Sequence, residues 1–277
     1  MLNFKKSLTV TTGLLLGLLA NCGLTGKNMK LTDFFRPEMV ELIRSIEKGD
    51  ETQARAMIKQ GLSLNVQGDE GITPLFWLVM QKNKPAMRLA IKLGADPNFA
   101  DPSGDSPVTL MAGANDDELL LILLEGGGDP NAIDRNGYPA IFGAIGHERL
   151  EQIKMLMRFG ADINLTDRSG ANSVLYASDI NRYEMVHYLI EQGVNYSVRD
   201  ANRGDIAWNV HEGLSENLLS PDYPAYGWAV KVKQQLIDRG VKFPPPSPRE
   251  VRWSEGNPNQ FDIEARDKAL LDQDNKP

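Results

Sequence analysis

Few residues of this chain could carry out covalent or metal chemistry. It holds one cysteine, Cys22, and three histidines, His147, His187 and His211. None of them belongs to a His-Glu-x-x-His or Cys/His spacing, so no zinc site is predicted. The segment that starts at Gly213 lacks the second glycine of a nucleophile elbow, and the one at Gly126 lacks the lysine of a phosphate loop. We therefore predict no enzyme activity, no metal and no cofactor.

The one cysteine follows a segment typical of secretion. Lys5 and Lys6 precede an apolar run, residues 7–20, that is too short to cross a bilayer. The tetrad Leu19-Ala-Asn-Cys22 resembles the lipobox of bacterial lipoproteins, although Asn21 departs from the usual small residue. This resemblance implies a signal peptide over residues 1–21, lipidation of Cys22 and a lipidated tether over residues 22–33. Gly23 stands where inner-membrane retention uses aspartate, which implies an outer-membrane lipoprotein facing the periplasm.

Two alternatives to this N-terminal interpretation stay open. An uncleaved anchor, or an ordinary signal peptide with a coincidental cysteine, would leave Cys22 without lipid. Met29 and Met39 follow the leader, and translation from either would give a minor cytosolic form. We favour the interpretation that these are chance methionines.

The rest of the chain has a period of 33 residues. Glycines at 61, 94, 127, 160 and 193 keep this step, as do asparagines at 65, 98, 131 and 164 and aspartates at 101, 134, 167 and 200. The segments Gly71-Ile-Thr-Pro-Leu and Gly94-Ala-Asp-Pro-Asn resemble the ankyrin consensus. The resemblance implies an all-α ankyrin-repeat solenoid of stacked helix-loop-helix units with turn fingers.

Residue types suggest how each unit begins and ends. A left-handed glycine at positions such as Gly61 and Gly94 would end the second helix. Thr73 and Ser106 precede prolines and would cap the first helix of their repeats. The third repeat has Pro139 in that place, so its helix start should be looser. Apolar columns such as Met57, Ala90, Leu123, Leu156 and Leu189 are expected to form the core.

The period also sets the expected domain limits. An ankyrin-repeat domain over 34–243 would contain an N-terminal capping repeat, four full repeats and a C-terminal repeat. In the last repeat the final glycine, Gly240, comes 14 residues late, so we place an insertion at 212–226. This insertion could bind a partner or only cap the stack. Residues 244–277 read as a Pro-rich polar tail, disordered or laid along the convex surface, with a short helix from Ile263 to Leu271.

Charge narrows the class of partner. The chain carries a formal net charge of −7, and removing the leader with Lys5 and Lys6 makes it −9. Phosphates would repel such a domain, so nucleic acid is excluded as a partner. A basic protein, or a basic face of one, suits it better.

Ankyrin domains bind through their turn tips and the concave face of their first helices, and the resemblance places candidate contacts on this chain. The predicted partner-binding residues are Glu70, Ile72, Trp77, Met80, Gln81, Asp105, Arg135, Tyr138, His147, Arg168, Tyr176, Asp179, Tyr223 and Tyr226. Aromatic residues supply large contact areas at small ordering cost. A core role for Trp77 and Tyr176 stays equally open. Ile72 and Met80 beside Tyr138 are expected to form an exposed apolar patch.

These features together resemble the ankyrin-type immunity lipoproteins that neutralise phospholipase effectors of type VI secretion systems. The resemblance covers the leader, the repeats and the start Leu31-Thr-Asp-Phe-Phe35. It implies a protein that is monomeric when free and that clamps a secreted phospholipase at its substrate entrance or lid. The alternative is a housekeeping periplasmic scaffold that binds an envelope or oxidative-stress protein.

Overall fold

The computed structural model describes residues 29–216 and 218–274. The expected signal peptide and the lipidation site Cys22 lie outside the described residues. Within the described ranges, regular structure is helical apart from one isolated bridge between Ile133 and Pro139. None of the helices in those ranges is long and apolar enough to cross a membrane. The chain divides into two compact units, Met1–Gly128 and Asp129–Pro277.

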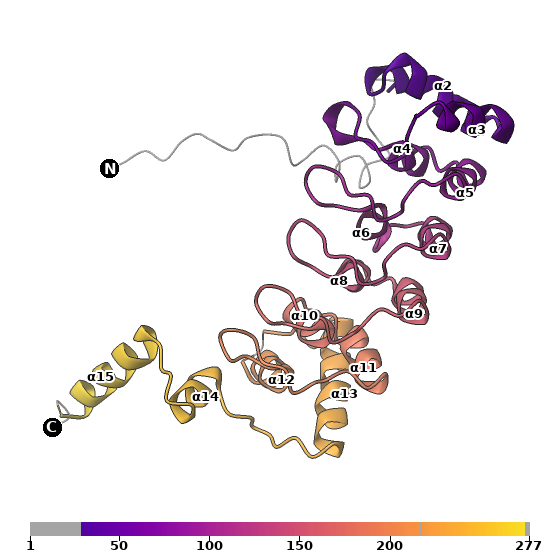
Figure 1. Ribbon diagram of the computed structural model, residues 1–277. Coiled ribbons are helices and arrows are strands. Elements are labelled where there is room, and N and C mark those ends of the chain that lie inside the picture. Colours follow the sequence, from indigo (N-terminus) through magenta and orange to yellow (C-terminus); the bar gives the residue numbers. More distant parts are fainter. Residues whose placement is uncertain (1–28, 217, 275–277) are drawn as a thin grey trace. The chain divides into compact units, whose positions relative to one another are not determined.

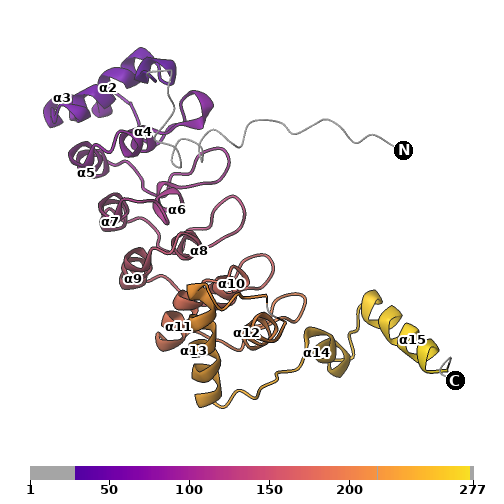
Figure 2. The same ribbon diagram turned by 180° about the vertical axis from the view of Figure 1, so that it is seen from behind.

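The first unit consists of three helix pairs. Two short 3-10 helices, η1 (Leu31–Asp33) and η2 (Asp69–Gly71), accompany α2 (Pro37–Glu47), α3 (Glu51–Lys59), α4 (Pro74–Met80), α5 (Lys84–Lys92), α6 (Pro107–Met111) and α7 (Asp117–Glu125). Within this unit α2 packs on α3, α4 on α5 and α6 on α7 (Figures 1 and 2). Leu31 is buried, so the folded domain begins before the expected residue 34.

The second unit continues the same scheme and then departs from it. Its helices are α8 (Ala140–Gly146), α9 (Leu150–Arg158), α10 (Ser173–Asp179), α11 (Tyr183–Glu191), α12 (Ile206–Ser215), α13 (Pro224–Asp238), α14 (Pro248–Ser254) and α15 (Gln260–Asp274). Helices α8, α10 and α12 are the first helices of their repeats, and α10 packs on both α8 and α12. Helix α13 packs on α11 and α12. Figure 1 shows the loops before α10 and α12 extending from the side of these first helices.

Helix starts follow the predicted caps where a capping side chain is present. The hydroxyl of Thr73 accepts a hydrogen bond from the Phe76 amide at 3.1 Å, and that of Ser106 accepts one from Thr109 at 3.2 Å. Asn172 does the same for Leu175. Helix α8 follows Pro139 with no side-chain cap, as the residue type requires. That this start is looser remains a prediction.

The helix ends confirm the predicted role of the repeated glycines. Gly61, Gly94, Gly127, Gly160 and Gly193 all have φ between 84° and 103°, a region that side chains with a Cβ atom seldom enter. The first apolar column is also confirmed as core, because Met57, Ala90, Leu123, Leu156 and Leu189 are all buried.

The repeated asparagines join successive repeats through the backbone. In the first unit, the Asn65 amide donates to the Gly94 carbonyl at 3.0 Å, and its side-chain oxygen accepts from the Asp96 amide at 2.8 Å. In the second unit, Asn131 makes the same pair of bonds to Gly160 and Asp162. Each asparagine thus satisfies backbone groups at the helix end of the next repeat.

The repeated aspartates shape the loops between repeats, which we call fingers (residues 68–72, 101–105, 134–138, 167–171 and 200–204). The Asp101 carboxylate accepts from the amides of Ser103 and Asp105, and Asp167 accepts from Ser169 and Ala171 in the same way. In the last finger Arg203 replaces the usual glycine and still adopts φ 72°. A non-glycine residue there is strained by roughly 1 kcal/mol.

The 14 additional residues of the last repeat lengthen both of its helices. Helix α12 has 10 residues where α10 has 7, and α13 has 15 where α11 has 9. In the intervening loop Leu219 is buried against Gly213, whereas Leu218 is 66% exposed. The insertion therefore contributes a capping contact and also an exposed surface.

The segment after Phe243 differs from the polar tail expected from sequence. It forms α14 and α15, and α15 includes the predicted short helix. Ser247 and Glu250 make a reciprocal capping box that starts α14, which explains why the Pro-rich stretch ends there. Val251 is buried, so α14 belongs to the folded unit.

Candidate protein-binding surface

Three aromatic rings form a cluster on the first helices of the second unit. Tyr138 ends a finger, Phe142 lies on α8 and Tyr176 lies on α10. The rings of Phe142 and Tyr176 are stacked with centroids 4.3 Å apart, and the Tyr138 ring lies 5.7 Å from that of Tyr176. Phe142 is buried, Tyr176 is half-buried and Tyr138 is 38% exposed. A buried ring thus fixes two tyrosines that present area to solvent.

A glycine leaves room for the hydroxyl of Tyr176. A Cβ atom added at Gly146 would lie 3.3 Å from this hydroxyl oxygen, which is tighter than most such contacts. Burial raises the pKa of Tyr176, and the charges of Asp134 and Asp167 raise it further, while Arg182 lowers it. The hydroxyl therefore stays protonated at neutral pH and can donate a hydrogen bond.

Carboxylates surround the aromatic cluster. The Asp179 side chain is exposed in part, and the protein atoms packed around the rest of it displace water, which raises the pKa of Asp179 to about 6; the charges of Asp200 and Asp167 raise it as well. One hydrogen bond opposes this rise, from the Asn209 amide to the Asp179 carboxylate at 2.7 Å. The same amide also donates to the Ser178 hydroxyl at 2.8 Å, which fixes its position between α10 and α12. A cationic side chain placed here would be favoured by several negative charges.

An arginine beside this surface is paired with a carboxylate outside the aromatic cluster. Arg182 contacts Glu148 at 2.7 Å and donates to the Gly146 carbonyl at 3.3 Å. Tyrosine faces next to carboxylates are suited to Lys or Arg side chains, through cation–π contact and charge-assisted hydrogen bonds.

The predicted contacts of the first unit divide into exposed and buried residues. Glu70 and Gln81 are exposed and Met80 is half-buried. The prediction that Ile72 and Asp105 project to solvent is wrong, because both side chains are buried. Each of these residues is the last of a finger and directly precedes the N-cap residue of the following helix, Thr73 or Ser106. In that position their side chains point toward the core.

Trp77 is a core residue. It is 5% exposed, its ring lies 6.0 Å from that of Phe34, and its indole donates to Glu47 at 3.1 Å. The open choice between anchor and core is therefore decided for core. With Ile72 buried as well, the expected apolar patch does not form.

The predicted contacts of the second unit remain largely accessible. His147 and Arg168 are exposed and Arg135 is half-buried; the Arg168 side chain lies over Gly137, whose added Cβ would come within 2.6 Å of it. Tyr223 is 69% exposed and Tyr226 is half-buried. Tyr223 lines a pocket of about 260 Å³ beside Arg182 and Trp228. The structure thus brings the rings of Tyr138 and Tyr176 together and places Asp179 three residues after Tyr176 on α10. Tyr226 lies on a different helix, α13, and Tyr223 is the residue that precedes this helix.

Sequence reasoning missed two residues that support this surface, Phe142 and Asn209. Asn209 stands 33 residues after Tyr176, so the repeat period could have pointed to it. Nothing in the spacing distinguished Phe142 from other apolar residues of its helix.

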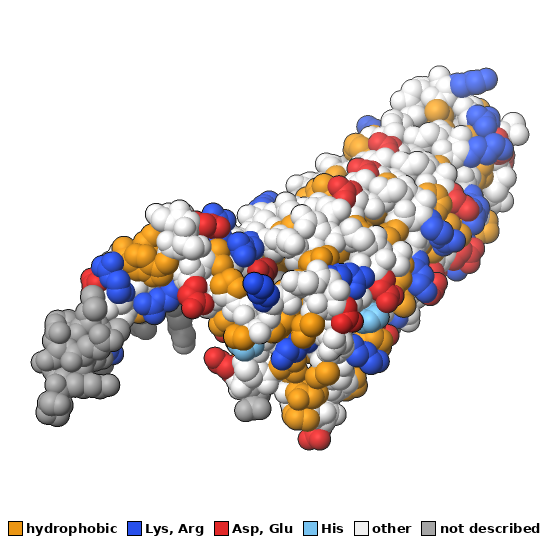
Figure 3. All heavy atoms as spheres, turned by 90° about the horizontal axis from the view of Figure 1, so that it is seen from below, with side chains coloured by type: hydrophobic (Ala, Val, Ile, Leu, Met, Phe, Trp, Pro, Cys, Tyr) orange, Lys and Arg blue, Asp and Glu red, His pale blue; other side chains and the backbone are white. Residues whose placement is uncertain are grey.

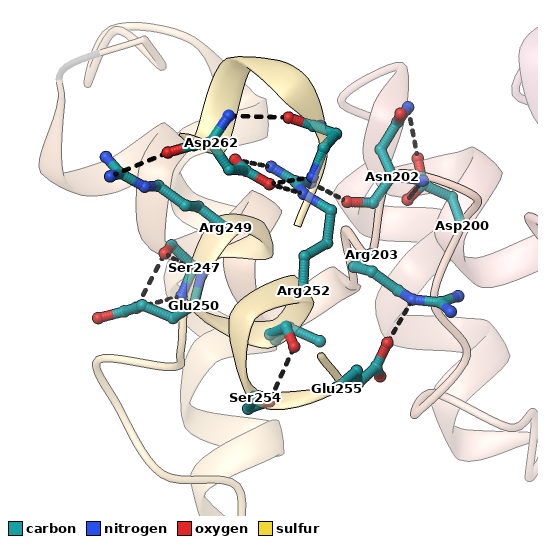
Figure 4. Close-up of polar contacts among 12 residues, drawn as sticks. Asp200, Asn202, Arg203, Ser247, Arg249, Glu250, Arg252, Ser254, Glu255 and Asp262 are labelled. Carbon is teal, nitrogen blue, oxygen red and sulfur yellow. Dashed lines mark hydrogen bonds and ion pairs between the residues drawn. The ribbon is translucent and has the colours of Figure 1, made fainter. Parts of the chain in front are cut away.

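The last finger is held by the C-terminal helices (Figure 4). Arg252 forms two bonds to Asp262, at 2.6 and 2.7 Å, and also donates to the Asn202 carbonyl. Arg203 contacts Glu255 at 2.7 Å. The hydrogen bonds from Arg252 lower the pKa of the buried Asp262 carboxyl to about 2. These contacts fix the strained Arg203 and reduce access to this finger.

No metal-binding geometry appears in the part of the chain that the structure describes. Within residues 29–216 and 218–274, no group of three or more His, Cys, Asp or Glu side chains could hold a metal ion.

Comparisons with known proteins agree with this geometry. Residues 108–200 match the family model described as ankyrin repeats in three copies. An ankyrin repeat domain from Acinetobacter baumannii is 20% identical with a TM-score of 0.59, and the match covers 74% of this chain and 100% of that one. The ankyrin repeat domain of Bcl-3, a member of the IkappaB protein family, is 21% identical with a TM-score of 0.60, covering 76% and 92%. The comparison with curated proteins found no match.

Residues 108–200 thus match ankyrin repeats, and the predicted all-α ankyrin solenoid is confirmed as the fold class of the chain. Ankyrin repeats generally mediate protein–protein binding and are typically not enzymes, and no catalytic family is indicated.

Proposed function

We propose that the second unit binds a basic segment of a protein partner through Tyr138, Tyr176 and Asp179. The observation that carries this proposal is the tyrosine pair fixed on buried Phe142, with the carboxylates of Asp134 and Asp167 close enough to raise the pKa of Tyr176. A Lys or Arg side chain of the partner would lie against the tyrosine faces and contact Asp179. Central aromatic anchors of this kind supply most of the affinity of many interfaces.

For the partner and the location, we propose a periplasmic immunity lipoprotein that inhibits a type VI secretion phospholipase effector. The tetrad ending at Cys22 supports lipidation, and the lipid would tether the domain where such an effector arrives. The acidic net charge suits a basic surface near the effector's substrate entrance. Binding there blocks access of lipid to the active site.

Co-expression with a candidate phospholipase effector tests the proposal. Cells that export the lipase to the periplasm should survive only when the full-length protein is present. A Tyr138→Ala, Tyr176→Ala double variant should lose protection, whereas the exposed change Gln60→Ala, outside the predicted contacts, should retain it. Equal killing with and without the protein would refute the immunity function.

A separate variant tests location without changing the binding surface. Cys22→Ser should leave purified complex formation unchanged and should release the protein from the outer-membrane fraction. If Cys22→Ser remains membrane-bound to the same extent as the parent, lipidation at this residue is not the anchor. Affinity capture from the native envelope then identifies the partner directly, and recovery of an envelope or oxidative-stress protein would favour the scaffold alternative.

A further inference from the structure

Helix α13 is apolar on two opposite faces. Ala229, Val232 and Leu236 are fully buried toward α11 and α12. On the other side, Val230 is 45% exposed and Ile237 is 41% exposed. Large apolar side chains exposed close together on one helix mark a surface that contacts something other than water. The outward face of α13 therefore requires an explanation that the repeat core does not provide.

The repeat register explains why this face is uncovered. Ile190 on α11 occupies the repeat position of Ile237, and it is only 2% exposed in a helix that packs against α13. The chain after α13 turns to the finger 200–204 and does not add another repeat. Figure 3 shows the molecule from below, the side toward which α13 points in Figure 1, with hydrophobic side chains among Lys and Arg.

Further apolar residues extend this face at the start of the helix. Tyr223 is 69% exposed, Tyr226 is half-buried, and Leu218 in the preceding loop is 66% exposed. Tyr223, Val230 and Ile237 recur every seven residues, which places them along one side of α13. We call this set, with Tyr226, the α13 apolar row.

The charge along α13 is opposite to that of the whole chain. Between residues 224 and 243 there are four basic residues, Lys231, Lys233, Arg239 and Lys242, and one acidic residue, Asp238, in a chain whose net charge is −7. Lys231 lies 3.9 Å from the centre of the Trp228 ring, and Lys233 lies 5.4 Å from that of Phe243. Acidic residues on adjoining elements are Glu184 and Glu191 on α11, Glu212 on α12, and Glu216 and Asp222 in the loop. Basic charge is thus concentrated on the helix that carries the apolar row.

We propose that the α13 apolar row and its lysines dock on an anionic phospholipid surface. Lysine stems can lie along apolar surface while their ammonium groups reach lipid phosphates, and tyrosine rings favour the interface. A basic helix with an exposed apolar side is suited to lie flat in this region. The contact is independent of any lipid on Cys22 and of the partner that the tyrosine surface binds.

A fluorescent label on α13 can test this directly, because Cys22 is the only cysteine in the chain. In full-length protein carrying Cys22→Ser, the change Gly227→Cys provides an attachment point that is exposed and has no atom within 4 Å of its added Cβ. An environment-sensitive dye there should shift to the blue with vesicles containing about one third phosphatidylglycerol, and not with pure phosphatidylcholine. The matched control places the dye at Gln60→Cys, an exposed position at the end of α3, where no shift is expected.

Two pairs of substitutions separate the apolar and the charged contributions. Val230→Ser with Ile237→Ser, and separately Lys231→Gln with Lys233→Gln, should each weaken vesicle binding about tenfold or more. Val230, Ile237 and Lys231 are exposed and Lys233 is half-buried, so the melting temperature of each variant should stay near that of the parent, and this measurement checks that the variants fold. Added salt should weaken binding of the parent far more than that of the lysine variant.

Several results would overturn the proposal. They are the absence of a blue shift at residue 227 on anionic vesicles, an equal shift on neutral vesicles, and an equal shift at residue 60. Unchanged binding by both folded double variants would overturn it as well. Because every arm carries Cys22→Ser and lacks the lipase, none of these results bears on the immunity function.

Discussion

Trp77 in the first unit and Tyr176 in the second occupy the same position of the repeat, 99 residues apart, yet they have different surroundings. Trp77 is 5% exposed, packs near Phe34 and donates a hydrogen bond to Glu47. Tyr176 is half-buried and stacks on Phe142, with its hydroxyl next to Gly146.

The preceding repeat accounts for this difference. The N-terminal capping repeat supplies a ring and a carboxylate that enclose Trp77. The repeat before Tyr176 has glycines at 143 and 146, which provide no side chain to cover it. An aromatic residue on the first helix of a repeat is thus a core residue when side chains of the preceding repeat enclose it, and an anchor when they leave it exposed.

The largest effect should come from removing Trp77. Trp77→Ala leaves a cavity against Phe34 and an unpaired Glu47, so we expect a loss of about 3–5 kcal/mol in the free energy of unfolding. Trp77→Phe keeps the ring contact and should cost about 1 kcal/mol for the lost hydrogen bond. Urea unfolding followed by circular dichroism measures both. A loss below that of Trp77→Phe would contradict a core role.

Removing Tyr176 should affect partner binding more than stability, the reverse of what is expected for Trp77. Tyr176→Ala should cost about 1–2 kcal/mol of stability, because the ring is only half-buried, and should weaken partner binding about 10- to 100-fold. Tyr176→Phe keeps the stack on Phe142 and should bind within a few-fold of the parent. Titration calorimetry with the captured partner gives the affinities. If folded Trp77→Phe lost more affinity than Tyr176→Ala, the assignment of core and anchor would be reversed.

The pH dependence of Asp179 gives a smaller effect. Its pKa is raised to about 6 in the folded state, whereas an aspartate in the unfolded chain titrates near 4. Ionisation between pH 4 and pH 6 therefore lowers stability, and this cost is absent below pH 4. Asp179→Asn should raise stability at pH 7.5 by less than about 1 kcal/mol, because solvent screens an exposed carboxylate, and should have no effect at pH 3.5.

The same variant should weaken binding of a basic partner at pH 7.5 and have less effect at pH 5, where Asp179 is mostly protonated. Thermal melts and calorimetry at the two pH values measure these changes. Equal stabilisation by Asp179→Asn at pH 3.5 and pH 7.5 would show that the charge is not its cause.

The smallest effect concerns the start of α8. Pro139→Ser adds the hydroxyl cap that α4 and α6 possess, a gain of about 0.5–1 kcal/mol, and loses a similar contribution from proline rigidity. We expect a net change within about 0.5 kcal/mol. Hydrogen exchange should nevertheless slow at the first amides of α8. Faster exchange there would show that the start is limited by something other than the missing cap.

The sequence predicted the fold well because its signals recur. The glycines that end helices, the hydroxyl caps and the first apolar column each appear several times at one period, so chance matches are improbable. The helices after Phe243 were less predictable. Their docking depends on Arg252, Asp262 and the Asn202 carbonyl, contacts between residues 10 and 50 positions apart with no repeated counterpart.

The binding surface was predicted only in part. The register placed Tyr138, Tyr176 and Asp179 on one side of the repeats, and the structure finds the two rings in contact. The repeat register alone could not show that the Ile72 side chain points into the core or that Phe142 supports the two tyrosines. Burial depends on the neighbouring repeat, whose side chains differ while the period stays constant.

The asparagine bonds between repeats have a consequence for how this protein can change over generations. Asn65 and Asn131 hold the next repeat through a backbone carbonyl, which every residue type provides, and a backbone amide, which every type except proline provides. The spacing of the repeats therefore does not depend on the side chains that face a partner. Residues such as Tyr138 and Asp179 can therefore be substituted as a partner diverges, while the spacing of the repeats that positions the new residues is retained.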